Sequence, residues 1–371
     1  MTYDIAIVGA GILGLAHAKA ARDRGLRVVV IDRDAQANGA SIRNFGFITV
    51  SGQEAGECWQ FARRSRDVWL EVANAAEIPV LQRGLVVAAR RQAAEAVIDA
   101  FLATDMGQDC RRLSLNEARG FVPCLSDSVT AALYSPHELR VESKTAIPQL
   151  ARWLAKACGV DFRWNEQVLD IMPPSIRTDR GTIDAGAVIL CPGDNYHGPL
   201  SDNLAARNLT RCKLHMLRVK PARPVRLATA LMSDLGLARY LGYADLPEAA
   251  DLKALLDREQ PALRQNGVHL IAVQSADGSL VVGDSHHYGA TPDPFQPQWV
   301  DDLILEELAA VARLPGAQVC ERWIGTYASS PDGWLLRDAP LPSVRQVIVT
   351  AGCGASTSFG IAEATLADLL G

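Results

Sequence analysis

Short runs of apolar residues, each closed by a glycine-bearing loop, recur along this chain and predict its strands. The first run covers residues 3–8 and breaks into a loop at Gly9, and a second covers residues 27–31 and ends in the acid Asp32. Between the two lies a segment whose apolar residues have helical spacing. The N-terminus is therefore predicted to form a strand–turn–helix–strand unit.

Two later runs are mostly apolar, and the first of them is apolar throughout, which is typical of a strand buried on both faces of a sheet. They cover residues 187–191, before Gly193, and residues 346–350, before Gly352. Pro148 is expected near the first turn of a helix, where a missing N–H costs little. Other patterns predict strands at 84–89, 161–164, 168–172, 268–273 and 280–283, hairpin turns at 179–181 and 277–278, and helices at 57–74, 90–104, 145–158, 297–313 and 358–369.

The order of these elements predicts an α/β fold with two domains, which also suits a chain of 371 residues. A Rossmann-type dinucleotide-binding domain is expected from three non-contiguous segments, residues 1–80, 143–200 and 322–371. The intervening segments, 81–142 and 201–321, are expected to form an α+β substrate domain with a mostly antiparallel sheet.

Composition narrows the class of protein. Hydrophobic residues make up 49% and charged residues 21%, so the chain can bury a large core, and a net charge of −5 argues against a nucleic-acid partner. No run of about 18 apolar residues predicts a membrane span, and the first strand starts too early to leave room for a signal peptide. The eight cysteines are scattered without a metal-ligand spacing. We expect a cytoplasmic protein with reduced thiols, no metal site and no membrane partner.

The first loop carries the residues that a dinucleotide requires. Gly9 permits a tight turn, Gly11 lets backbone N–H groups approach a pyrophosphate, and Gly14 lets the helix pack closely on the strand. The helix N-terminus then presents partial positive charge to the phosphates, and Asp32 is placed to accept hydrogen bonds from a ribose. A glycine-bearing turn that binds no nucleotide is the alternative.

Seven segments resemble known flavoproteins. Four of them are similar to the FAD-dependent amine oxidase family that includes glycine oxidase, sarcosine oxidase and D-amino-acid oxidase: the glycine motif from Gly9, the strand 187–193, the segment 327–333 and the loop 351–360. Three more resemble a bacterial subgroup linked to aminophosphonate breakdown, namely 41–46, 139–143 and 283–289. The resemblance implies the glutathione-reductase-like flavoprotein fold and FAD as the cofactor.

FAD rather than NAD also agrees with the single dinucleotide motif in the chain. The terminal loop is expected to feed a helix whose N-terminus faces the pyrimidine edge of the flavin and favours negative charge there. The residues that the motif and the resemblance together assign to the cofactor are Gly9, Gly11, Ile12, Leu13, Gly14, Asp32, Arg33, Ser41, Arg43, Asn44, Val168, Gly193, Gly352, Gly354, Thr357 and Ser358.

Departures from the family pattern change the expected chemistry. Sarcosine oxidase-like members hold FAD covalently through a cysteine at the position of Gly325, so non-covalent FAD is expected. Tyr327 stands where glycine oxidase-like members have an arginine that grips the substrate carboxylate, and Ser356 replaces a lysine of sarcosine oxidases. The usual carboxylate clamp is therefore absent. Val281 replaces the lysine that promotes oxygen reduction, which leaves oxygen or another electron acceptor open.

The resemblance places four residues at the substrate: Arg43, Asn44, His286 and Tyr327, with Phe45 and Phe47 as walls of the pocket. Consecutive strand residues face opposite ways, so only one of His286 and His287 is expected to reach the ligand, and His286 is favoured. A surface role for Arg43 and a structural role for His286 are the alternatives. No catalytic base is named. Further donors that the sequence does not place are Arg140, Lys213, Arg218 and Arg337.

The resemblance implies hydride transfer from the carbon beside a neutral amine to flavin N5, then imine hydrolysis. With the carboxylate clamp lost, the expected substrate is 2-aminoethylphosphonate or its N-methyl derivative. Its oxidation gives phosphonoacetaldehyde and an amine, and reoxidation by O2 gives H2O2. One alternative is a glycine, sarcosine or D-amino-acid oxidase with a rearranged clamp, for example through Arg43. Another is a flavin-binding dehydrogenase component or assembly subunit that is not itself an amine oxidase.

Overall fold

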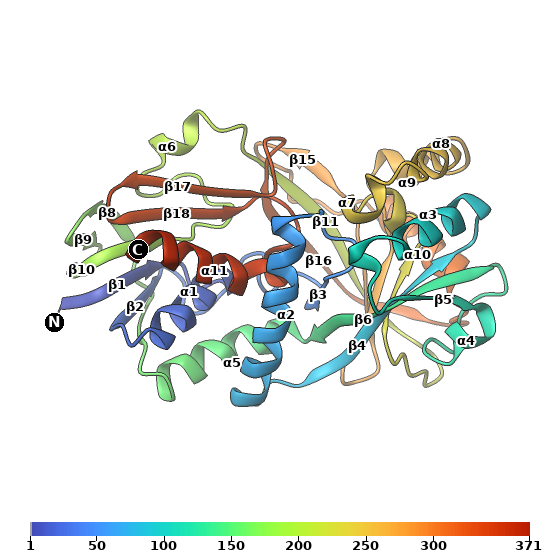
Figure 1. Ribbon diagram of the computed structural model, residues 1–371, viewed down its shortest axis with the longest axis horizontal. Coiled ribbons are helices and arrows are strands. Elements are labelled where there is room, and N and C mark those ends of the chain that lie inside the picture. The colour runs from blue at the N-terminus through green and yellow to red at the C-terminus, as the bar shows by residue number, and fades with distance from the viewer. Residues whose placement is uncertain (1) are drawn as a thin grey trace.

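The structure is a computed structural model that describes residues 2–371. Two β-sheets lie end to end along the long axis of the molecule, and both chain termini lie on the first of them (Figure 1). Each sheet has its own cluster of buried apolar side chains, consistent with two layered units that share one chain.

The first sheet has β1 (Thr2–Val8) at its centre, parallel to β2 and to β10. Ile5 pairs with Val28 on one side and with Ala187 on the other, so the apolar runs of the sequence are the buried strands in the middle of the sheet. The order is β17 (Leu335–Leu341), β18 (Val344–Val349), β10 (Gly181–Leu190), β1, β2 (Val28–Asp32) and β7 (Asp161–Trp164), and β8 (Val168–Met172) and β9 (Ser175–Thr178) form a hairpin against β10.

Helices cover this sheet on the faces that the apolar strands expose. α1 (Ile12–Asp23) packs against α11 (Gly354–Leu370), and α11 packs against α2 (Glu57–Ala75), as Figure 1 shows. The contact of α11 with α2 requires Gly360, because a Cβ at that position would lie 2.8 Å from the backbone of Phe61. α5 (Ser143–Lys156) lies beside α1.

The second sheet is mostly antiparallel, and its order is β15 (His287–Gly289), β11 (Thr210–Lys220), β14 (Leu280–Gly283), β13 (Ile271–Gln274), β12 (Ala230–Ser233), β4 (Val80–Ala89), β6 (Ala131–Val141) and β3 (Phe47–Ile48). β16 (Gln318–Ser329) pairs with β11 and β5 (Arg111–Ser114) pairs with β6. Only β12 and β4 are parallel neighbours among the described strands of this sheet.

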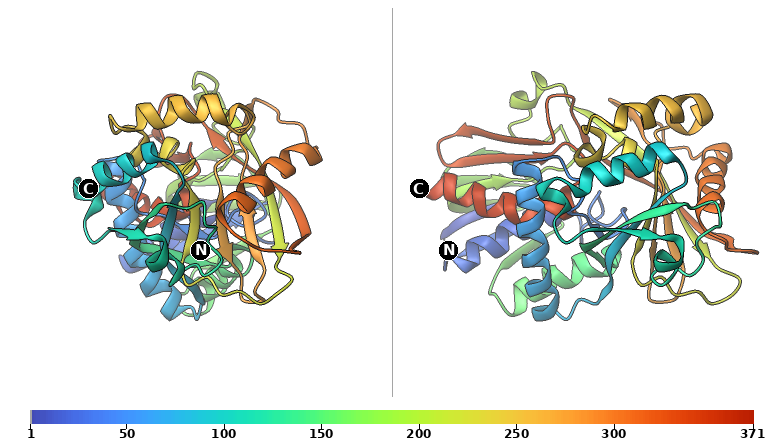
Figure 2. Two further views of the ribbon diagram at one scale, coloured as in Figure 1. Left: turned by 90° about the vertical axis from the view of Figure 1, so that its right-hand side faces the viewer. Right: turned by 45° about the vertical axis from the view of Figure 1, so that its right-hand side comes forward.

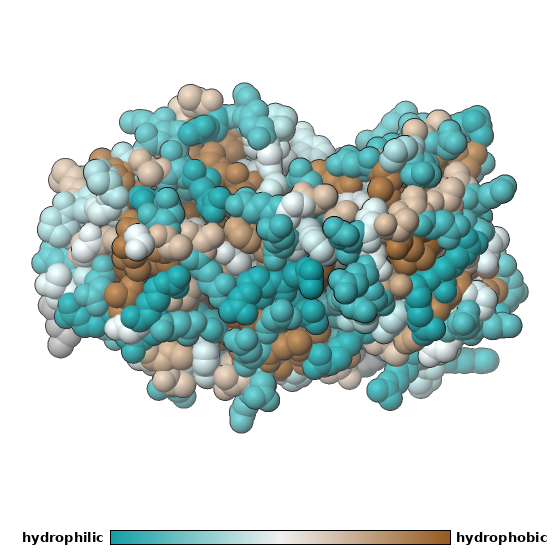
Figure 3. Space-filling model, in the orientation of Figure 1, coloured by the Kyte–Doolittle hydropathy of each residue, from teal (hydrophilic) through white to brown (hydrophobic). Residues whose placement is uncertain are grey.

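Shorter helices surround the second sheet, at the end away from the C-terminus (Figure 2). They are α3 (Gln92–Leu102), η1 (Asp105–Gly107), α4 (Leu115–Arg119), η2 (Gly236–Ala238), α7 (Leu241–Ala244), α8 (Ala249–Glu259), α9 (Pro261–Gln265) and α10 (Gln298–Val311), while α6 (Asp202–Ala205) lies near β17. The face in Figure 3 is mostly hydrophilic, with small hydrophobic areas between the polar ones. Among the residues described, no helix combines the length and apolar character that a membrane crossing requires.

The first sheet is parallel from β18 to β7 and carries antiparallel strands at β17 and in the β8–β9 hairpin, and the second sheet is mostly antiparallel. This α/β arrangement confirms the predicted fold class. The predicted domain boundaries need two corrections. Residues 322–329 belong to β16 and so to the second sheet, and β3, within the segment 1–80, also pairs there with β6. Both strands pair with strands that are distant in the sequence, and local sequence patterns do not reveal such pairings.

Element ends differ most where polar or small residues open an element. α11 starts at Gly354 rather than at 358, because its first turn consists of small residues that resemble a loop. α5 starts at Ser143, so Pro148 lies in its second turn and not its first. The sequence patterns did not predict β6, β11 or β16. In β11 the buried Lys213, His215 and Arg218 interrupt the apolar pattern, and each pairs with a carboxylate.

Candidate active site

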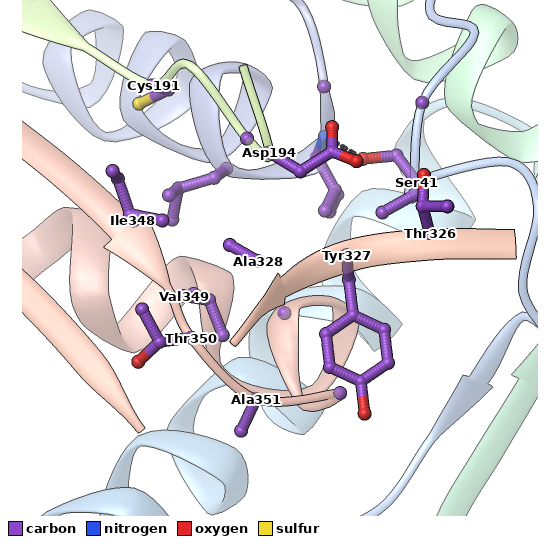
Figure 4. Close-up of a pocket in the computed structure, with 18 of the residues that line it drawn as sticks. Ser41, Cys191, Asp194, Thr326, Tyr327, Ala328, Ile348, Val349, Thr350 and Ala351 are labelled. Carbon is purple, nitrogen blue, oxygen red and sulfur yellow. Dashed lines mark hydrogen bonds between the residues drawn. The ribbon is translucent and has the colours of Figure 1, made fainter. Parts of the chain in front are cut away.

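A large cavity of about 650 Å³ runs from the carboxyl ends of β1, β2 and β10 to the second sheet. Its volume lies within the usual range of cofactor and substrate sites, about 300–1,000 Å³. Figure 4 shows Tyr327 and Ala328 of β16 on one side, and Val349, Thr350 and Ala351, at and beyond the end of β18, on another. The cavity thus lies where ligands bind in open parallel sheets, and the second sheet closes it.

The end of the cavity at β1 is a close-packed glycine turn. A Cβ on Gly9 would lie 2.4 Å from the carbonyl oxygen of Cys191, and one on Gly14 would lie 1.9 Å from that of Gly9. Gly9 also has a φ of +104°, which only glycine adopts without strain. Gly11 is the N-cap of α1, so the cavity meets the free N–H groups at the start of that helix.

Asp32 and Ser41 fix this turn from opposite sides. The backbone N–H of Ala10 donates to Oδ2 of Asp32 at 2.6 Å, and that of Ile12 donates to Oγ of Ser41 at 2.9 Å. Burial raises the pKa of Asp32, while the hydrogen bonds from Ala10 and Asp34 lower it. Its carboxyl oxygens retain lone pairs that can accept from ribose hydroxyls.

Fourteen of the sixteen residues predicted to bind the cofactor line this cavity: Gly9, Gly11, Ile12, Leu13, Gly14, Asp32, Arg33, Ser41, Arg43, Asn44, Val168, Gly193, Gly352 and Gly354. The other two, Thr357 and Ser358, lie further along α11 and outside the lining. Thr357 instead donates to the carbonyl of Cys353 within the helix. Both are buried in the packing of α11, a consequence of the earlier start of that helix.

The cavity fits an FAD on these observations. The close-packed glycine turn brings the N-terminus of α1 to the cavity, Asp32 lies next to it, and Gly352, Cys353, Gly354 and Ala355 bring the N-terminus of the long helix α11 to the opposite wall. Gly325 also lines the cavity, and a Cβ there would lie 3.0 Å from the carbonyl oxygen of Arg43. The residue at this position therefore offers no thiol for a covalent link.

The four predicted substrate residues, Arg43, Asn44, His286 and Tyr327, all line the same cavity, as do Phe45 and Phe47. Asn44 is used structurally, because its amide donates to the carbonyl of Ala40 at 2.7 Å and its oxygen accepts from Gly46. The guanidinium of Arg43 donates to Asn38 at 3.3 Å. Burial raises the pKa of Tyr327 well above its ordinary value, so its hydroxyl stays protonated.

The two neighbouring histidines lie as the strand alternation predicts. His286 lines the cavity and its Nδ1 lies 2.9 Å from the carbonyl oxygen of Gly267, whereas His287 packs against His215 outside the lining. The rings of His286 and Tyr327 are edge to face, with centroids 6.4 Å apart. Burial, with the nearby charge of Arg239, lowers the pKa of His286 well below its ordinary value, so the ring is neutral.

Sequence reasoning missed Arg239, between η2 and α7, which lines the cavity. Its guanidinium donates to the hydroxyl of Tyr288 at 3.0 Å and pairs with no carboxylate among residues 2–371. Burial opposes its charge, but Tyr288, Tyr327 and Asp284 together keep its pKa above the ordinary value. The residue follows no motif, so only the fold identifies it as a cation of the cavity.

The four unplaced donors are engaged elsewhere. Lys213 pairs with Asp293 at 2.9 Å, Arg218 with Glu321 at 2.8 Å, Arg337 with Glu57 at 2.9 Å and Arg140 with Glu142 at 3.1 Å, and none of the four lines the cavity. Each of these charges is already balanced. Arg239 differs from them because it faces the cavity without a carboxylate partner.

Asp284 and His269 also face the cavity and were not singled out from the sequence. Burial raises the pKa of Asp284 to about 8, against the opposing effect of Arg239. Near neutral pH this carboxyl is therefore mainly protonated and does not cancel the charge of Arg239. A hydrophobic run that ends in Gly-Asp-Ser-His gave no local reason to expect a buried acid there.

A protein-family comparison identifies one family. The family described as "DAO: FAD dependent oxidoreductase" matches residues 4–369, nearly the whole chain. No curated protein matches the sequence.

Solved structures share the fold at low sequence identity. Glycine oxidase from Geobacillus kaustophilus is 20% identical with a TM-score of 0.76, and the match covers 99% of this chain and 94% of that one. L-proline dehydrogenase from P. horikoshii is 17% identical with a TM-score of 0.77, covering 98% and 92%. Iminodiacetate oxidase from Chelativorans sp. BNC1 is 17% identical with a TM-score of 0.72, covering 97% and 94%.

Proposed function

Because this chain belongs to the DAO family of FAD-dependent oxidoreductases, we propose that it oxidises the C–N bond of a small amine that carries an anionic group, and that this group is a phosphonate. The observation that carries the proposal is the guanidinium of Arg239, which faces the cavity with no carboxylate partner among the described residues. A half-buried guanidinium without a counter-ion favours the binding of an anionic ligand beside it.

Donors around Arg239 favour a phosphonate over a smaller anion. The hydroxyl of Tyr288 is within hydrogen-bond distance of Arg239, and the protonated Tyr327 lines the same cavity. A phosphonate offers three oxygens and up to two charges, so it can accept two bonds from a guanidinium and further bonds from hydroxyl groups. The segments that resemble the aminophosphonate subgroup support the same substrate class.

FAD, when bound, accepts a hydride from the carbon next to the amine nitrogen, and the imine product then hydrolyses. The protein positions the substrate and excludes water from the cavity. Phe45, Phe47 and Trp334 line the cavity with apolar surface that excludes water, and Arg239 anchors the anionic end of the substrate. The N-terminus of α11 favours negative charge at the wall opposite the glycine turn.

With N-methyl-2-aminoethylphosphonate or 2-aminoethylphosphonate as substrate, the products are phosphonoacetaldehyde and methylamine or ammonia. We propose O2 as the electron acceptor, with H2O2 as its product. A small carboxylate amine is the second candidate, because one guanidinium also suits a carboxylate. Glycine oxidase and iminodiacetate oxidase, both of which share the fold, are named for such substrates. In that case Arg239 is the rearranged clamp.

The first experiment mixes the purified holoprotein anaerobically with N-methyl-2-aminoethylphosphonate, 2-aminoethylphosphonate, sarcosine, glycine, iminodiacetate and D-alanine in turn. Bleaching of the flavin band by the aminophosphonates alone supports the proposal, and bleaching by the carboxylates alone supports the second candidate. Flavin that no amine bleaches without added protein supports an electron-transferring subunit instead. Precipitation with acid, in the same preparation, tests whether the flavin is released and hence non-covalent.

A further inference from the structure

Three polar side chains meet at the ends of two neighbouring strands, where the cavity passes under the second sheet. His269 precedes β13, and Asp284 and His286 follow β14. The backbones of His269 and Asp284 hydrogen-bond to each other in both directions, at 3.3 Å, which extends the hairpin by one pair. The three side chains are therefore held by the sheet itself and not by a mobile loop.

The carboxyl of Asp284 lies between the two rings. Its Oδ1 is 3.3 Å from Nδ1 of His269 and its Oδ2 is 3.8 Å from Nε2 of His286. Nδ1 of His286 is next to the carbonyl of Gly267 and must donate to it, so the neutral ring turns its bare Nε2 towards Asp284. Nδ1 of His269 and Oδ1 of Asp284 are buried and make no hydrogen bond to other described residues.

All three side chains are at least nine-tenths buried: Asp284 is 4% exposed, His269 3% and His286 7%. Buried polar atoms without partners are costly, and they are retained where a proton or a ligand uses them. The other titratable groups that line or border this part of the cavity are Arg239, Tyr240, Tyr288, Tyr327 and Cys212. Arg239 is the cation among them.

We propose that Asp284 is the proton acceptor of this cavity, and that His269 and His286 are positioning residues that hold its carboxyl. The inference rests on the proposed function. An amine with a basic nitrogen arrives as an ammonium ion and must lose one proton before its nitrogen lone pair is free. That N–H bond breaks with its electron pair left on nitrogen, and an O–H bond forms on Asp284, so no electrons are exchanged.

The charge distribution favours a proton over a metal ion at this cluster. The ligand atoms of His269, Asp284 and His286 lie within 4.8 Å of one another, so a cation is the other occupant to consider. The positive guanidinium of Arg239 lies close enough to lower the pKa of both histidines, after the larger effect of burial. The same field opposes a divalent cation, whereas at Asp284 burial outweighs the effect of Arg239 and keeps the pKa of the carboxyl raised.

The proposal predicts that the rate of flavin reduction rises with pH. Asp284 accepts a proton only when it is ionised, and burial raises its pKa to about 8. Between about pH 7 and about pH 9, the ionised fraction and the rate of flavin reduction by an amine should rise about tenfold. Asp284→Asn should lower that rate about 100-fold at about pH 9, and the residual rate should follow the ionisation of the free amine. His286→Gln should move the midpoint of the profile without removing it.

Two measurements on the holoprotein test this. Anaerobic stopped-flow records flavin reduction by each amine against pH, and infrared difference spectra of the resting protein record the carbonyl band of protonated carboxyl groups. A band that disappears near pH 8 in the unaltered protein and is missing in Asp284→Asn supports the proposal. The matched control is Asp301→Asn, which breaks another buried pair, between Asp301 and His215 at 3.0 Å, outside the cavity.

The outcomes separate this inference from the proposed function. If no amine bleaches the flavin while the infrared band titrates, the proposed function is wrong and the proton site stands. If amines bleach the flavin and Asp284→Asn keeps the rate and the pH profile, the proton acceptor is overturned. Loss of activity with a chelator and its recovery with added Zn2+ would also overturn it, in favour of a metal ion at the same three residues.

Discussion

The two ends of the cavity are built in different ways. The cofactor end at β1 consists of backbone: the closely packed Gly9 and Gly11 let the chain turn so that the start of α1 meets the cavity, and Asp32 and Ser41 tie the turn with side-chain hydrogen bonds. The substrate end consists of side chains from the segment after β14, from β16 and from the η2–α7 connection. There Arg239 lacks a counter-ion and Asp284 and His269 leave buried atoms without partners.

This difference shows which groups at each end would bind a ligand: backbone N–H groups at one end and side chains at the other. A site made of backbone loses affinity for its ligand when an added side chain blocks it, because it binds only through unobstructed and correctly directed N–H groups. A side-chain cluster loses function when a charge is removed, because the partners that remain cannot compensate. The following predictions test that contrast, starting with the largest expected effect.

Arg239→Ala should have the largest effect on substrate. Removing the guanidinium should lower kcat/KM for an anionic amine about 1,000-fold, equivalent to about 4 kcal/mol, because the anion loses a charged donor that has no carboxylate partner among the described residues. The flavin spectrum and FAD affinity should not change. Arg313→Ala, at an exposed arginine paired with Asp127, is the matched control in the same steady-state assay. An unchanged kcat/KM in Arg239→Ala would place the anion elsewhere.

Gly11→Ala should weaken the cofactor end by an intermediate amount. A Cβ there would lie 3.0 Å from Oγ of Ser41, whose hydroxyl can turn aside, and Gly11 has a φ of −70°, so the protein should fold. The added methyl group occupies space beside the first N–H groups of α1, and FAD affinity should fall about 30-fold, or about 2 kcal/mol. Fluorescence titration of apoprotein with FAD measures this. Gly289→Ala, with no atom within 4 Å of its Cβ, should bind FAD normally.

His17 should make the cofactor domain sensitive to acid. It is buried on α1 and burial lowers its pKa from 6.5 to about 4, so it folds neutral and the unfolded chain binds more protons between these values. Stability is therefore fully present above about pH 6.5 and falls on acidification, by about 2 kcal/mol at about pH 5 from this residue. Urea unfolding at the two pH values measures the loss. His17→Gln should reduce it, whereas an equal acid loss in the variant would contradict the assignment.

Arg43→Ala should have the smallest effect. Arg43 lines the cavity but is partly exposed, and its guanidinium already donates to Asn38. We expect KM for an aminophosphonate to rise less than about threefold, since an exposed donor shares its ligand with water. Steady-state KM values for aminophosphonates and for glycine measure this. A selective loss of carboxylate substrates in the variant would instead favour the amino-acid oxidase and make Arg43 its clamp.

The sequence and the structure agree best where one stretch of chain contains the whole feature. The glycine turn, the acid Asp32 and the terminal loop each lie within or beside a single strand–helix unit, and fourteen of the predicted cofactor residues line the cavity. Thr357 and Ser358 fall outside it because α11 begins earlier than its small residues suggested. At the substrate end, Tyr327 and His286 came from local segments that resemble the family, and both line the cavity.

The amino-acid sequence by itself determined the α/β fold and the glycine turn at the β1 end of the cavity, because apolar periodicity and a turn motif depend on a few neighbouring residues. The family followed from the resemblance of local segments to known flavoproteins, and the family comparison confirms it. Only the tertiary structure showed that Arg239 lines the cavity without a carboxylate partner among the described residues. Nothing in the sequence distinguishes Arg239 from four other basic residues that each pair with a carboxylate in the fold, namely Arg140, Lys213, Arg218 and Arg337. The burial and the pKa of a residue depend on every element packed around it. The raised pKa values of Arg239 and Asp284 therefore follow only from the tertiary structure around the cavity.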